Sequence, residues 1–89
     1  MAIINQRITS SGVKAASVAI VADGALLWGV QCNSGGTATV YDNATAASGT
    51  VLAVATVADT VFFNQPIAAN AGLYLSMTGT GAIVYYSRD

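Results

Sequence analysis

Three of the four aspartates of this 89-residue chain raise the question of a metal site or an acid/base pair: Asp23, Asp42 and Asp59. Each lies beside an expected turn, where an aspartate side chain accepts hydrogen bonds from nearby backbone. Their spacing lacks the closely spaced oxygen ligands of a calcium-binding loop. We therefore interpret them as turn residues and expect no bound metal.

Nucleophilic catalysis is the second chemistry that the residue types suggest, because the chain contains one cysteine and many serines and threonines. Such nucleophiles are normally activated by a neighbouring base, most often histidine. The chain has no histidine and no glutamate. Cys32 falls on the apolar face of an expected strand, which favours a small buried hydrophobic residue. We expect no enzymatic activity.

Glycine pairs and basic residues are the features that could bind phosphates. Gly35-Gly36 and Gly79-Thr80-Gly81 do not open a helix, so they lack the geometry of a phosphate cradle and are expected to end hairpins. The basic residues are Arg7, Lys14 and Arg88, and the net charge is −1. Nucleic-acid binding requires clustered cations. The sequence therefore predicts no cofactor and no nucleic-acid partner.

The elements that would position these residues are short strands, and the clearest lies between Ala25 and Tyr41. Residues 25–32 alternate with the period of a strand, residues 33–36 are turn formers, and residues 37–41 resume a β-branched run. A four-residue connection is too short for a parallel crossover, so we expect an antiparallel hairpin. Its first strand would present one apolar face formed by Leu26, Trp28, Val30 and Cys32, opposite Leu27, Gly29 and Gln31.

Two further hairpins are expected. Asp23-Gly24 is a turn signal between a run at residues 16–21 and the Trp28 strand. Residues 72–78 and 82–87 form another alternating pair, and the first of these carries Leu73, Leu75 and Met77 on one face.

Three segments remain in the middle of the chain. Residues 42–49 are small and polar and predict a loop. Residues 50–57 predict a strand that is apolar on both faces, whose second face another subunit could cover. Residues 60–64 predict a short strand, and Pro66 makes residues 65–71 a connection.

The whole chain, residues 1–89, is expected to form a single domain. Residues 1–12 are either a first strand or an arm that orders against a neighbouring subunit. With that segment there are about eight short strands at intervals of roughly eight to twelve residues. This spacing predicts an all-β, antiparallel sandwich or barrel.

The chain has few charged residues to cover the surface of a monomeric protein. Hydrophobic residues make up 54% of the chain and charged residues 8%, compared with roughly a quarter charged in ordinary domains. A membrane span would need about 20 consecutive apolar residues, and no run approaches that length. No secretory signal is visible either, so folding in a cytoplasm is expected. We infer excess apolar surface that self-association or docking would cover.

Three aromatic residues are candidates for such an interface. Trp28 is expected in the core, with an interface anchor as the alternative. Tyr85 and Tyr86 are adjacent in a strand and must face opposite ways, so one of them is a candidate subunit contact.

Two stretches resemble small proteins from the virions of tailed bacteriophages: LLWGVQCNSGGTATVYDNATAASGTVL and VFFNQPIAANAGLYLSMTGTGAIVYY. The shared pattern is a strand ending in Gly-Val, a turn into a Val-Tyr-Asp strand end, a small-residue loop, and a final Gly-Leu-Tyr, Thr-Gly-Thr, Val-Tyr-Tyr unit. It covers about Leu26 to Tyr86. These motifs consist of common strand and turn residues.

The resemblance implies a jelly-roll-like β-sandwich that decorates or cements the outside of a phage capsid. It further implies a homotrimer seated on the major capsid protein, in the virion, after folding in the host cytoplasm. The alternative function is a receptor- or glycan-binding module associated with a head or tail fibre, in which Tyr41 or Tyr74 would stack on sugars. The family offers no catalytic motif to carry over.

Overall fold

The computed structural model describes residues 8–33, 36–56, 59–79 and 81–88. Every regular element in these ranges is a strand, so none of them contains a helix that could span a membrane. The all-β prediction is therefore confirmed. The strands are β1 (Thr9–Ser10), β2 (Val18–Val21), β3 (Ala25–Cys32), β4 (Thr37–Asp42), β5 (Thr50–Thr56), β6 (Thr60–Ala69), β7 (Leu73–Met77) and β8 (Ala82–Ser87).

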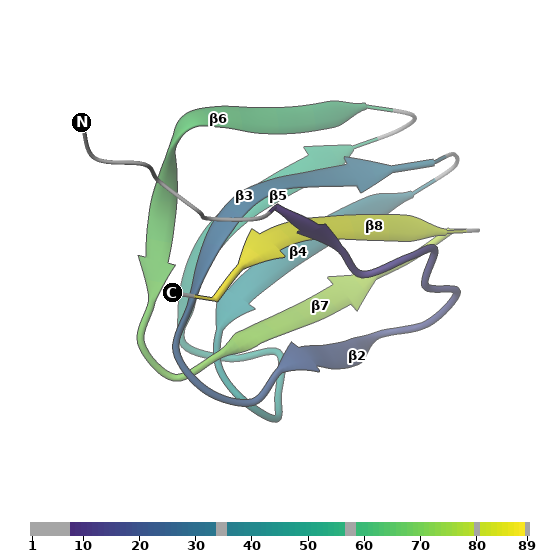
Figure 1. The fold of residues 1–89 in the computed structure, drawn as a ribbon. Coiled ribbons are helices and arrows are strands. Elements are labelled where there is room, and N and C mark those ends of the chain that lie inside the picture. The colour runs from purple at the N-terminus through teal and green to yellow at the C-terminus, as the bar shows by residue number, and fades with distance from the viewer. Residues whose placement is uncertain (1–7, 34–35, 57–58, 80, 89) are drawn as a thin grey trace.

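The strands form two four-stranded antiparallel sheets packed face to face (Figure 1). Sheet A has the order β1-β8-β3-β6, and sheet B has the order β2-β7-β4-β5. Each edge strand pairs with its neighbour in a nested order along the chain: β1 pairs with β8, β2 with β7, β3 with β6 and β4 with β5. The pairs β3–β8 and β4–β7 then join these hairpin-like pairs into sheets. This is the order of a jelly-roll sandwich, as predicted.

The core lies between the sheets and is built from small and medium aliphatic side chains. Leu27, Val30 and Val84 of sheet A are fully buried, as are Val40 and Leu75 of sheet B. In β4, β5, β7 and the first half of β8, buried residues alternate with more exposed ones, which is the period expected of a sheet with one face in the core. Leu73 and Leu75 are buried and Met77 packs against them, so the face predicted for residues 72–78 is confirmed.

The three predicted hairpins are wrong. Strands β3 and β4 lie in different sheets, and so do β2 and β3, and β7 and β8. Among the described strands, β4 and β5 are the one pair that is consecutive in sequence and hydrogen-bonded together. A short turn-rich connection either reverses a strand within its sheet or carries the chain to the facing sheet about 10 Å away. Local sequence does not distinguish the two outcomes.

The predicted faces of β3 are also partly wrong, because a β-bulge interrupts this strand. Both ladders of β3 shift register between Leu27 and Gly29, which leaves Trp28 as the extra residue. An extra residue reverses the side-chain alternation beyond it. Leu27 is therefore in the core with Val30 and Cys32, and Trp28 points outward with Leu26. The expectation that Trp28 belongs to the core is wrong.

Pro66 does not end the ladder, contrary to the prediction. Strand β6 runs from Thr60 to Ala69 and passes through Pro66. It is the edge strand of sheet A, and its pairing with β3 skips from Phe62 to Ile67 at the bulge. Edges and bulges are the places where a sheet tolerates proline. Figure 1 shows β6 turning a corner along its length.

Two further expectations concern edge strands of the sheets, β5 and β1. Strand β5 matches the predicted strand up to Thr56, with Ala53 and Ala55 inside and Val51 and Val54 exposed by 49% and 45%. Cover of that outer face by another subunit stays a prediction. Within the predicted strand or arm at residues 1–12, β1 pairs with β8, and residues 1–7 lie outside the described ranges.

Candidate functional site

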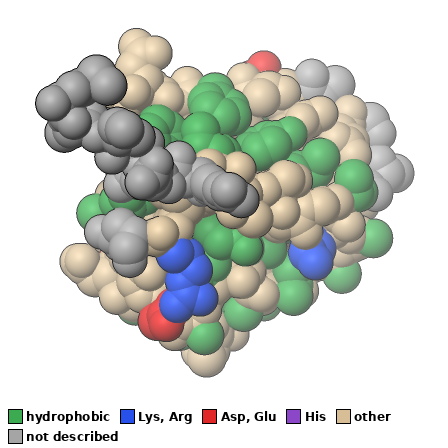
Figure 2. Space-filling view, viewed as in Figure 1, with side chains coloured by type: hydrophobic (Ala, Val, Ile, Leu, Met, Phe, Trp, Pro, Cys, Tyr) green, Lys and Arg blue, Asp and Glu red, His purple; other side chains and the backbone are tan. Residues whose placement is uncertain are grey.

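The outer face of sheet A carries several large apolar and aromatic side chains around one glutamine. Strand alternation places them there, because their neighbours Leu27, Val30 and Val84 are fully buried on the inner face. We call this surface the aromatic face. It consists of Leu26, Trp28, Gln31, Phe62, Ile83 and Tyr85. In Figure 2, hydrophobic side chains gather over β3, β6 and β8 in the upper part of the view.

The centre of the aromatic face is a row across three strands. Gly29 of β3 pairs with Phe62 of β6 on one side and with Tyr85 of β8 on the other. Because glycine has no side chain, the two rings meet above it, with centroids 5.4 Å apart and planes tilted by 47°. The Tyr85 hydroxyl donates to Oε1 of Gln31 at 3.0 Å, which fixes that ring. Phe62 is 52% exposed. Its ring has no polar group that a hydrogen bond could hold in place.

Trp28 lies at one end of the aromatic face and is held by a second hydrogen bond. Its indole Nε1 donates to Oγ of Ser87 at 2.9 Å. Ser87 is only 1% exposed, so this bond satisfies a buried hydroxyl as well as the indole N–H. The half-buried Trp28 ring therefore has a defined position on the surface, which is what an interface anchor requires.

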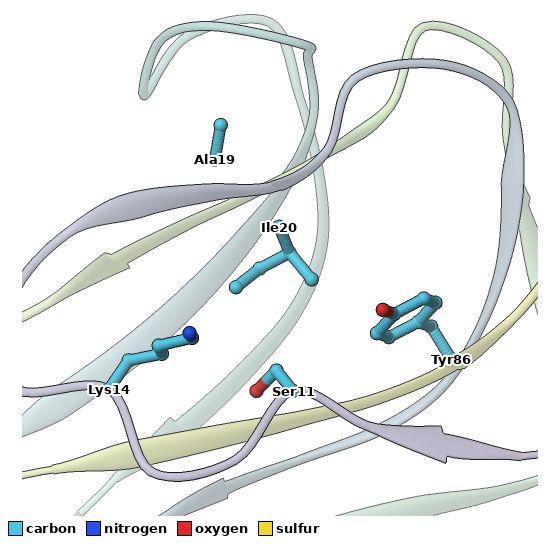
Figure 3. Close-up of a pocket in the computed structure, with 5 residues that line it drawn as sticks. All are labelled: Ser11, Lys14, Ala19, Ile20 and Tyr86. Carbon is cyan, nitrogen blue, oxygen red and sulfur yellow. The ribbon is translucent and has the colours of Figure 1, made fainter.

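Tyr86 lies on the opposite side of β8 from Tyr85, as the strand period predicts. It packs against the core and lines a pocket of about 100 Å³ between β8, β2 and the segment that joins β1 to β2 (Figure 3). Ser11, Lys14, Ala19 and Ile20 complete the lining. Small-molecule pockets usually have volumes of about 300 Å³ or more. The structure thus brings Trp28 and Tyr85 together on one face and leaves Tyr86 out.

The outer face of sheet B has a different chemistry. Tyr41 of β4 pairs directly with Tyr74 of β7, and in the next outward row Thr39 pairs with Ser76. We call this surface the hydroxyl face. Its members are Thr37, Thr39, Tyr41, Val51, Val54, Tyr74 and Ser76. All seven are partly or fully exposed, whereas the alternate residues Val40, Leu73 and Leu75 are buried.

Charged side chains lie at the ends of the sandwich, away from both outer faces. The charged residues in the described ranges are Lys14, Asp23, Asp42, Asp59 and Arg88. Arg88 forms an ion pair with Asp23 at 2.6 Å, with both side chains more than half exposed. Such a pair contributes little to stability. Both faces are therefore electrically neutral over their described area.

Asp42 is the aspartate with the clearest structural role. Its carboxylate accepts hydrogen bonds from the backbone N–H groups of Ala71 at 2.8 Å, Asn70 at 3.1 Å and Gly72 at 3.4 Å. The bond from Ala71, supported by the other two, lowers the pKa of Asp42 from its ordinary value of 3.8, and desolvation only partly opposes this. Asp42 therefore ties the end of β4 to the turn between β6 and β7.

Asp59 and Asp23, which complete the aspartates of the described ranges, also have local partners. Asp59 accepts the N–H of Thr60 at 2.8 Å, as expected of a turn residue, and Asp23 pairs with Arg88. Within the described ranges no three side chains of His, Cys, Asp or Glu come together as a metal site would require. Cys32 is 1% exposed and belongs to the core, as predicted.

Sequence reasoning missed Phe62 as a surface residue. Phe62 and Phe63 are adjacent, and only the register with β3 decides which one faces outward. One signal was available, because a glycine inside a strand often marks a bulge or a close approach. Gly29 is such a residue, and Phe62 lies over it.

Comparison of the chain with protein-family models, with curated proteins and with solved structures finds no match.

Proposed function

We propose that this chain is a structural binding protein of a bacteriophage virion, which attaches to the outside of the capsid and cements or decorates it. The single observation that supports this proposal is the aromatic face. It exposes Phe62 and positions Trp28 and Tyr85 without a charged side chain among them. Aromatic side chains that become buried when a partner binds, on a patch without charge, are typical of protein interfaces.

The size of the aromatic face indicates how it would act. Six residues of three strands span roughly 20 Å by 14 Å, or about 300 Å². Burying this area would contribute about 7 kcal/mol at 25 cal/mol per Å². Association costs about 4 to 15 kcal/mol, so a single copy would bind weakly.

Several linked copies overcome this limit. Once one copy of an oligomer is bound, the others rebind at high effective concentration. We therefore include self-association in the proposal, as the homotrimer that the phage resemblance implies, with the major capsid protein as the second partner. Such an oligomer would hold neighbouring capsid subunits together, because separating them would also break its own contacts.

Co-sedimentation with assembled capsid shells tests this proposal. We expect the protein to pellet with shells and not to bind isolated, unassembled capsid protein. Phe62→Lys places a charge in the centre of the aromatic face and should weaken shell binding at least tenfold. Thr45→Lys is the control, because Thr45 is exposed and lies in the loop between β4 and β5 of the opposite sheet. It should bind as the unaltered protein does.

Two results would overturn the proposal. The first is a protein that does not associate with shells at any concentration. The second is a folded Phe62→Lys variant that binds shells as tightly as Thr45→Lys.

A further inference from the structure

Strand β5 forms an unprotected edge of sheet B. The edge strands of the two sheets are β1, β6, β2 and β5. An exposed edge presents unpaired N–H and C=O groups to other strands, and proteins usually protect it by shortness, charge, proline or a bulge. Strand β1 has two residues, β2 has four and a register shift, and β6 contains Pro66 and bends (Figure 1). Strand β5 has seven residues, TVLAVAT, without a charged residue, a proline or a glycine.

The backbone direction along β4 shows which groups of β5 point to this edge. The carbonyl of Thr37 accepts the N–H of Thr78 at 2.9 Å, so the backbone groups of Thr37 point to the β7 side. This direction alternates along a strand, and those of Ala38 therefore point to β5, where Ala38 pairs with Ala55. The backbone groups of Val54, the neighbour of Ala55, point the other way, to the open edge. In the described part of the chain they have no hydrogen-bond partner.

The side chains along this edge are small and apolar. Ala53 and Ala55 are buried in the core, and Val54 between them is exposed on the outer face. The register with β4 shifts at Leu52, closer to the start of the strand. Residues 53–56 are therefore regular strand, with both a free backbone and alternating side chains.

We propose that β5 pairs with β5 of a second copy of this chain, antiparallel and about a two-fold axis at Val54. In this register Val54 lies opposite its own counterpart, and the backbone groups of both are directed at each other, as in a hydrogen-bonded antiparallel pair. Ala53 lies opposite Ala55 of the second copy, so the core-facing sides of both strands coincide. A register shifted by one residue would place outward and core-facing side chains opposite each other. The pairing joins the two copies of sheet B into one continuous sheet.

Two properties favour a second copy over a strand of another protein. Charged residues normally prevent identical edges from pairing, and β5 has none, so two copies meet without repulsion. A second copy also brings the same small alanines to the core-facing side and the same valine to the outer side. Every molecule of this protein therefore carries a strand that matches the edge in backbone direction and in side-chain faces.

The expected contact is small. A seven-residue strand is about 24 Å long and a sandwich edge roughly 10 Å thick, so the pairing covers about 240 Å² per copy. Stable interfaces cover about 800 Å² per partner. The pair should therefore be weak and reversible, and it should form as the concentration rises or where copies are held close together.

This inference goes beyond the proposed function and does not depend on it. A two-fold contact between identical surfaces gives pairs and cannot by itself close a trimer. In the trimer of the proposed function, each copy would still carry one β5 edge, so edge pairing would join one trimer to the next. The pairing also leaves the outer face of sheet A uncovered, because β5 belongs to sheet B.

Analytical ultracentrifugation of the purified protein, without shells and from micromolar to millimolar concentration, tests the inference. We expect the mass of the unaltered protein to rise reversibly to at least twice that of Val54→Lys. Two lysines directly opposite each other repel, so this substitution should weaken self-association at least tenfold. Ala19→Lys is the matched control, because Ala19 is also exposed on an edge strand of sheet B, but on β2 at the opposite edge. It should associate as the unaltered protein does.

A charge exchange tests the two-fold axis itself. Val54→Asp should fail to pair with itself, as Val54→Lys does. An equimolar mixture of the two variants should pair at least tenfold more tightly than either alone, because opposite charges then face each other. The measurement belongs at about 0.15 M salt, where charges more than roughly 8 Å apart are largely screened. Rescue under these conditions requires Val54 to lie close to its own counterpart.

Three outcomes would overturn this inference. They are a constant mass of the unaltered protein over the whole range, a folded Val54→Lys variant that associates as Ala19→Lys does, and no gain on mixing the lysine and aspartate variants. A protein that never self-associates, but loses shell binding on Val54→Lys, would assign the edge to a strand of the capsid protein instead. Because the measurement contains no shells, its failure leaves the test with Phe62→Lys unaffected.

Discussion

The rings of Phe62 and Tyr85 meet with centroids 5.4 Å apart although their strands, β6 and β8, are not neighbours. The strand between them is β3, and the residue beneath the rings is Gly29. Adjacent strands are about 4.8 Å apart, so rings two strands apart touch only by leaning over an empty position. The aromatic face thus depends on one missing side chain.

Replacing Gly29 should therefore destabilise the protein. A Cβ at this position would lie 2.6 Å from the carbonyl oxygen of Val61 and 2.9 Å from Cδ2 of Phe62. We expect Gly29→Ala to lower the free energy of unfolding by about 1 to 3 kcal/mol, measured by urea denaturation. Gly24→Ala is the control, because its Cβ would meet only ordinary contacts at 3.5 Å or more, and it should change stability by less than about 0.5 kcal/mol. Equal effects of the two substitutions would argue against this account.

The hydrogen bond between Trp28 and Ser87 should also contribute to stability. Ser87→Ala leaves the indole N–H without its partner and should cost about 1 to 2 kcal/mol. Trp28→Phe removes the donor and leaves the buried Ser87 hydroxyl unsatisfied. In a double-mutant cycle followed by chemical denaturation, the two changes should be non-additive. Strict additivity would mean that the bond contributes nothing.

Asp42 should make stability depend on pH in the acid range. The folded protein lowers the pKa of this carboxyl, so its contribution is complete above the unfolded value near 3.8 and is lost as the pH falls through the folded pKa. Because the group is partly exposed, we expect Asp42→Asn to cost only about 1 kcal/mol at neutral pH. The difference between the two proteins should disappear well below pH 3.8. Thermal melts across this range measure it.

A matched control is available for the Asp42 prediction. Asp23 is also acidic, but its partner is the exposed side chain of Arg88. Asp23→Asn should therefore change stability by less than about 0.5 kcal/mol at any pH. A difference for Asp42→Asn that grows as the pH falls would have the wrong sign and would contradict the proposed role of its carboxylate.

Cys32 should be unreactive in the folded state. It is 1% exposed, and its backbone N–H donates to the carbonyl of Asp59. A chromogenic thiol reagent should react with it only after denaturant is added, at one thiol per chain. Rapid reaction of the native protein would show that this end of the sandwich opens readily.

The fold class was predictable because strand periodicity is local. Alternation placed Leu73, Leu75 and Cys32 in the core, and the structure confirms all three. The pairing of strands was not predictable in this way. The connection at residues 33–36 has the residue types of a hairpin, yet β3 and β4 belong to opposite sheets.

The candidate site was predictable only in part. Tyr85 and Tyr86 had to face opposite ways, and Tyr85 is the one that faces outward. Trp28 was misplaced because a bulge reverses alternation and becomes visible only when the partner strands are aligned. Tyr41 and Tyr74 are 33 positions apart in the chain, and no local pattern encodes their pairing.

The amino-acid sequence by itself determined that this chain forms short strands with an aliphatic core and a surface poor in charge, because side-chain period and composition act over a few residues. Tertiary structure alone decided which strands are neighbours, that Gly29 lies beneath two aromatic rings, and that the tyrosines of sheet B share a row. The physical reason is that these relationships depend on register between distant strands, and register is set by how the whole core packs.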